Sequence, residues 1–161
     1  MFFRKPKKEE NKPTENETID NDIVNNAVFG SLEFVDCAFE GYSKSSLFGE
    51  EKDIDLFVYV DEDERIVAER QEKAYLNYIR SRKEIEEAIR NAIIRHFKLP
   101  EDFDLGSRFR AFAVVVTMDG NCGLVIIDNT YSMGHHHYKF VVDTESGHEV
   151  TDTYEHYLNT K

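Results

Sequence analysis

The residues with the clearest potential for chemistry are three consecutive histidines, His135, His136 and His137. On a strand, His135 and His137 point the same way about 6.6–7 Å apart, and one metal ion can bridge that separation if a third ligand converges. If residues 144–147 form a four-residue turn, the antiparallel register places His156 opposite His135. A His135/His137/His156 group is therefore the candidate metal site. Its alternative, a polar and partly solvated strand face, is favoured, so we expect no metal or other cofactor.

The second candidate for chemistry is the thiol of Cys122. A catalytic cysteine needs its pKa lowered by a helix N-terminus or a neighbouring cation. The segment DGNCG instead places Cys122 at the start of a strand, which is typical of a core or strand-edge thiol. The sequence also lacks the G-x-S-x-G, G-x-x-x-x-G-K-[ST], G-x-G-x-x-G and H-E-x-x-H signatures of common enzymes. We expect a non-enzymatic protein, with a small enzyme using a His135/His137 metal site or the Cys122 thiol as the alternative.

Acidic and aromatic side chains come together in one short segment of the first half of the chain. Its aromatic residues lie on the side of a strand opposite the most apolar face, so either helices cover both faces or this surface receives a partner. Its acids would attract a basic protein. The predicted partner-binding site consists of Glu50, Glu51, Asp53, Asp55, Phe57 and Tyr59.

The elements that position these residues are read from the spacing of apolar side chains. Strict alternation over 52–61 indicates a strand, and weaker alternation over 28–35 and 37–43 indicates others before it. Helical spacing over 67–79 and again over 85–97 predicts two consecutive helices. They should break near Ser81, which forms an S-x-x-E capping box with Glu84, and end near Lys98, before Pro100.

The second half of the chain returns to the period of a strand. Residues 112–118 and 121–128 flank Asp119-Gly120, a strong hairpin signal, and 135–143 predict a third strand. The segment after residue 150 fits a strand or a short helix. Strands, two helices and strands again predict an α+β fold, a mostly antiparallel sheet with two consecutive helices packed on one face.

Length and composition limit the remaining possibilities. The 161 residues suggest one α+β domain over 27–161, and the polar segment 1–26, basic at its start, is expected to be a disordered tail. No apolar stretch suits a membrane span or a secretion signal, and two cysteines do not make a disulfide framework. A net charge of −12 argues against nucleic-acid binding. We expect a cytoplasmic protein with no nucleic acid and no membrane among its partners.

Several short motifs resemble those of a known group. They are Gly30-x-Leu32, the Ile54/Leu56/Val58/Val60 strand, Gln71-x-x-Ala74-Tyr75 and a late Asp143-x-Glu145-x-Gly147-x-Glu149. Together, over residues 28–151, they look like a group of bacterial domains of unknown function, similar in layout to the immunity-like proteins that accompany polymorphic toxins. The resemblance implies no catalytic residue. It implies a protein-binding module, in its most specific version a toxin-neutralising one whose partner is a basic protein such as a toxin domain.

Overall fold

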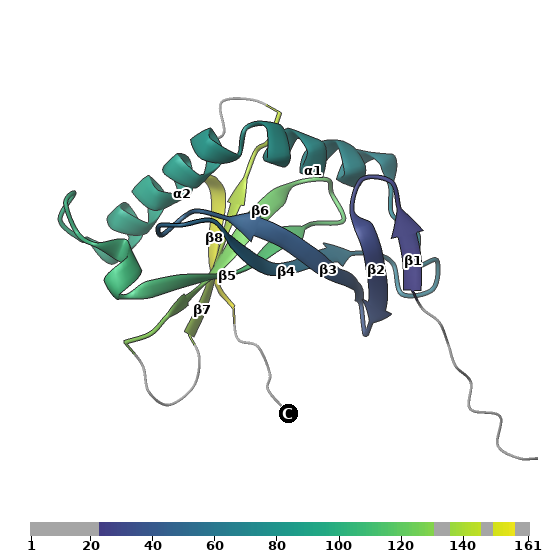
Figure 1. Ribbon diagram of the computed structural model, residues 1–161, viewed down its shortest axis with the longest axis horizontal. Helices are drawn as coiled ribbons and strands as arrows, with labels where there is room; N and C mark the ends of the chain where they lie inside the picture. The colour runs from purple at the N-terminus through teal and green to yellow at the C-terminus, as the bar shows by residue number, and fades with distance from the viewer. Residues whose placement is uncertain (1–22, 131–135, 146–149, 157–161) are drawn as a thin grey trace, which may run out of the picture.

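The computed structural model describes residues 23–130, 136–145 and 150–156 (Figure 1). Over these residues the chain forms one eight-stranded sheet in which the strands follow chain order. The strands are β1 (Ile23–Asn26), β2 (Gly30–Val35), β3 (Ala38–Ser45), β4 (Lys52–Tyr59), β5 (Phe109–Val116), β6 (Cys122–Asp128), β7 (His136–Val142) and β8 (Val150–His156). Neighbouring strands are antiparallel except for β4 and β5, which are parallel. The α+β class with a mostly antiparallel sheet is therefore confirmed.

The parallel pair explains why both helices fall between β4 and β5. Parallel neighbours cannot be joined by a tight hairpin, so the chain crosses over through α1 (Glu69–Arg80), α2 (Arg82–Phe97) and the short 3-10 helix η1 (Leu105–Ser107). The predicted break is at Ser81, although the Ser81 side chain makes no capping hydrogen bond. The second helix ends as predicted, because Lys98 takes a left-handed conformation with φ of 52°.

Both helices lie above the sheet in Figure 1, and their apolar side chains join one large buried cluster. Alternate residues of β4, namely Ile54, Leu56 and Val58, enter this cluster, as do Ile89 and Ile93 of α2. We call the sheet surface that contributes to this cluster the inner face and the opposite surface the outer face. The helices thus pack against the inner face of the sheet.

The domain begins earlier than the sequence suggested. Residues 23–26, expected in the disordered tail, form β1 and pair with β2, with Ile23 opposite Glu33. Asn26 secures the following turn, because its side-chain oxygen accepts hydrogen bonds from the backbone N–H groups of Val28 and Phe29. The Asn26 amide also donates to Glu72 of α1 at 2.8 Å. Residues 1–22 of the expected tail lie outside the described residues.

Candidate binding site on the outer face

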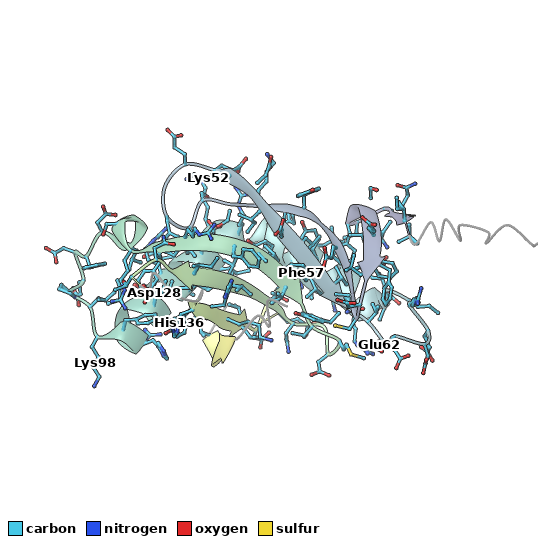
Figure 2. All side chains as sticks on the ribbon, turned by 90° about the horizontal axis from the view of Figure 1, so that it is seen from below. Lys52, Phe57, Glu62, Lys98, Asp128 and His136 are labelled. Atoms are coloured by element: carbon cyan, nitrogen blue, oxygen red, sulfur yellow. The ribbon has the colours of Figure 1, made fainter. Side chains whose placement is uncertain are left out.

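The outer face carries a row of acidic and aromatic side chains across β2, β3 and β4, in which Glu33 is exposed and the others are partly buried, namely Glu40, Asp55, Phe57 and Tyr59. Figure 2, seen from below, shows Phe57 on this face with the helices behind the sheet. Strand alternation explains the arrangement, because residues that follow each other along β4 point to opposite faces. The register sets Glu33 opposite Glu40 and Glu40 opposite Phe57, so that one line crosses three strands.

Three carboxylates gather at one end of this face, around a hollow of about 280 Å³. Glu33, Glu40 and Asp55 line this acidic end together with Ile23 and Phe57. Burial and then the nearby charges of Asp55, Glu33 and Asp36 raise the pKa of Glu40 above its ordinary value. Among the described residues, none of these three carboxylates forms an ion pair with a lysine or arginine. Within the part of the chain that the structure describes, the acidic end therefore presents negative charge that no paired base compensates.

An apolar hollow of about 180 Å³ adjoins the acidic end and shares Glu40 and Phe57 with it. This apolar end is lined by Tyr59, Phe112, Val115 and Val125 among others. Phe57 and Phe112 pack with ring centroids 6.2 Å apart. We call the two hollows together the outer groove.

A β-bulge brings Phe112 to the outer groove. The register of β5 against β6 shifts between Ala111 and Ala113. As a result Ala111 packs on the main cluster, whereas both Phe112 and Ala113 belong to the small cluster on the outer face. Bulges re-aim side chains in this way, and a simple alternation of the sequence cannot locate them.

The six predicted partner-binding residues fall into three places. Asp55, Phe57 and Tyr59 line the outer groove. Glu51 and Asp53 lie at the far end of the β3–β4 hairpin, where Lys44 is 3.6 Å from Glu51 and 3.3 Å from Asp53.

A second base compensates this hairpin end. Arg82 of α2 also pairs with Glu51 and lowers its pKa through that hydrogen bond. Glu50 lines a separate hollow beside β5. The acids that the sequence made most conspicuous are thus partly neutralised, and Glu33 and Glu40 take their place in the groove.

The histidine cluster differs from the predicted arrangement. His156 lies opposite His137 and not opposite His135, because the register shifts between Val141 and Val142 and the connection to β8 is longer than a four-residue turn. His137 is buried, with its ring 5.2 Å from that of Phe112. His135 lies outside the described residues. Within those residues no group of three or more potential ligands is placed to hold a metal ion.

The thiol of Cys122 is fully buried in the main cluster on β6. Burial raises its pKa well above the ordinary value, so the nucleophilic thiolate is disfavoured. Cys37, by contrast, is exposed in the β2–β3 turn at the rim of the apolar end. The environment of Cys122 is that of a core residue.

Two buried polar side chains on the helices hold loops and strands in place. Gln71 of α1 donates to the carbonyl oxygens of Tyr59 and Thr117, at 2.6 and 3.1 Å, and so ties the C-terminal ends of β4 and β5 to the helix. Glu86 of α2 accepts hydrogen bonds from both Ser45 and Ser46 at the end of β3. These contacts give both side chains a structural role.

A part-buried ion pair lies at the end of the sheet opposite to the Gln71 contacts, where β5 begins and β6 ends. Arg108 donates to Asp128 through two nitrogens, the shorter contact being 2.7 Å, and its guanidinium packs over the rings of Phe97 and Phe109. Burial opposes ionisation of Asp128, but the hydrogen bonds from Arg108 and Thr130 outweigh it and lower its pKa. The pair links the loop after η1 to the end of β6.

Comparisons of the chain with protein-family models, curated proteins and solved structures found no match. None of the helices within the described residues has the length and apolar character to cross a membrane.

Proposed function

We propose that this protein is a non-enzymatic binding module that receives a basic protein partner in the outer groove. The observation that carries the proposal is an acidic end, unpaired with any base among residues 23–130, 136–145 and 150–156, next to an aromatic end. In this proposal the two helices cover only the inner face, and the outer groove is open to a partner.

The two ends of the groove suit different steps of binding. Opposite charges accelerate the encounter of two proteins, and short-range packing of aromatic side chains slows their separation. Glu33, Glu40 and Asp55 would therefore set the association rate. Phe57 and Tyr59 would set the dissociation rate.

The most specific form of the proposal is a toxin-neutralising, immunity-like protein. The motif resemblance and the acidic outer groove support it, since a basic toxin domain is the complementary partner. The direct candidate is a toxin domain encoded beside the gene of this chain. An adjacent toxin gene would distinguish this role from the binding of some other basic protein.

The test measures association and dissociation rates between the full chain and that toxin domain at low and high salt. The triple variant Glu33→Gln/Glu40→Gln/Asp55→Asn should associate more slowly and with a flatter salt dependence. Phe57→Ala should mainly speed dissociation. The double neutralisation Glu101→Gln/Asp102→Asn, at an exposed site after α2, is the control and should behave like wild type.

Two results would count against the proposal. If the triple variant associates as fast as wild type at low salt, the acidic end does not steer the partner. If the toxin domain does not bind the chain at all, the immunity-like role is wrong.

A further inference from the structure

We propose that residues 2–8 of this chain bind its own outer groove, with the basic residues at the acidic end and Phe2 and Phe3 at the apolar end. The segment would then act as an internal competitor for the partner site. Only this competitive role rests on the proposed function. The docking itself stands on the chemistry of the groove and of the segment.

The segment and the groove are complementary in two parts. Residues 2–8 read FFRKPKK, which is two aromatic rings followed by four bases. The groove has an apolar, aromatic-lined end next to three carboxylates without basic partners among the described residues. A base close to Glu40 would relieve the crowding of negative charge that Asp55 and Glu33 impose on it.

The point at which the segment joins the sheet fits this placement. The described chain starts at Ile23, and Ile23 itself lines the acidic end of the groove. Moving back along the chain from Ile23, the bases of residues 4–8 come before Phe2 and Phe3. The groove has the same order, because its acidic end lies next to β1 and its apolar end extends to β6.

The intervening chain is long enough for this contact. Residues 9–22 span up to about 3.3–3.6 Å each, hence at most about 46–50 Å. From β1 to β6 there are five strand spacings of about 4.8 Å, or about 24 Å. Four charges and two rings bind weakly between separate molecules, but attachment to the same chain gives a high effective concentration.

The experiment uses paramagnetic broadening of amide signals in the full chain. A nitroxide is attached at Glu9→Cys in one sample and at Glu17→Cys in another, both with Cys37→Ser. Cys122 is buried, so it does not take the label. Without docking, the label at residue 17 lies closer along the chain to Ile23 and should broaden the amides of Glu40 and Phe57 more strongly.

Docking reverses that order, so that the label at residue 9 broadens these amides more than the label at residue 17. Charge reversal by Glu33→Lys/Glu40→Lys, or high salt, should restore the undocked order. The matched reversal Glu101→Lys/Asp102→Lys should leave the docked order intact. The proposal is overturned if residue 17 gives the stronger broadening in the otherwise unchanged chain, or if Glu33→Lys/Glu40→Lys has no effect.

This test contains no partner protein, and its outcome is therefore independent of the proposed function. A chain that fails to dock its own segment can still lose toxin binding in the groove variants. A chain that docks the segment but binds no toxin domain would retain the intramolecular contact and lose the proposed function.

Discussion

Replacing Gln71 should test how the crossover is held against the sheet. Gln71 is 2% exposed and makes three hydrogen bonds: its amide nitrogen donates to Tyr59 and Thr117, and its amide oxygen accepts from the backbone N–H of Ala68 at 3.0 Å. Gln71→Met keeps a chain of similar length and leaves all three backbone groups without that partner.

The magnitude follows from these contacts. At about 0.5–1.5 kcal/mol for each hydrogen bond, their loss should lower the free energy of unfolding by about 1.5–4.5 kcal/mol. That is a large part of the about 5–15 kcal/mol typical of a whole domain. Gln71→Glu should destabilise at least as much, because a carboxylate oxygen would face two carbonyl oxygens in place of a donor.

Urea unfolding followed by circular dichroism measures the change. Leu76→Gln, at an exposed position of the same helix, is the control and should alter the free energy of unfolding by less than about 0.5 kcal/mol. If Gln71→Met unfolds at the same urea concentration as Leu76→Gln, the Gln71 side chain does not hold the ends of β4 and β5 against the helix.

Two further predictions concern the core and the acid stability. Ile89→Ala removes a completely buried side chain and should cost about 2–5 kcal/mol in urea unfolding, whereas Asn91→Ala on the exposed side of α2 should cost under about 0.5 kcal/mol. Equal effects would mean that the helix is rotated. The pKa of Asp128 is lowered in the folded chain, so its stabilisation is present above the pKa of the unfolded state and is lost as pH falls through the folded pKa. Thermal unfolding across acidic pH should therefore show a smaller decline for Asp128→Asn than for wild type, and parallel curves would contradict this contribution.

The fold was predictable from the sequence where a local pattern of residues matches the way those residues pack in the folded chain. The alternation of β4, the two helical repeats and the Asp119-Gly120 turn each carry their own signal, and the structure confirms them. β1 was missed because a four-residue edge strand with two polar residues has little apolar pattern. The hydrogen bond from Asn26 to Glu72 joins residues far apart in the chain, so no local pattern indicates it.

The sequence predicted only those residues of the candidate site that lie together on one strand. Asp55, Phe57 and Tyr59 share the side of β4 that the alternation identified. Glu33 and Glu40 join them only through the register of the β2–β3 hairpin, whose two-residue turn at Asp36 and Cys37 has no Asn-Gly or Asp-Gly signature. Register, rather than composition, determined which acids belong to the groove.

The position of the groove in the sheet explains why its two ends differ. β1, β2 and β3 lie toward an edge, where charged side chains protect a sheet from pairing with another chain. β5 and β6 lie inside the sheet, where Val115 and Val125 are buried. The carboxylates of the acidic end, on β2, β3 and β4, add to the repulsion between copies of this acidic chain and would also attract a basic segment or partner.

These two roles of the carboxylates can be separated by experiment. Neutralising Glu33 and Glu40 weakens the repulsion between copies of the chain as well as the attraction of a partner, so the variants used for binding should also be run on a sizing column. If the triple variant stays monomeric and binds slowly, its slower association reports lost attraction. If it self-associates, the carboxylates also keep copies of the chain apart, and the single variants Glu40→Gln and Asp55→Asn then carry the binding test.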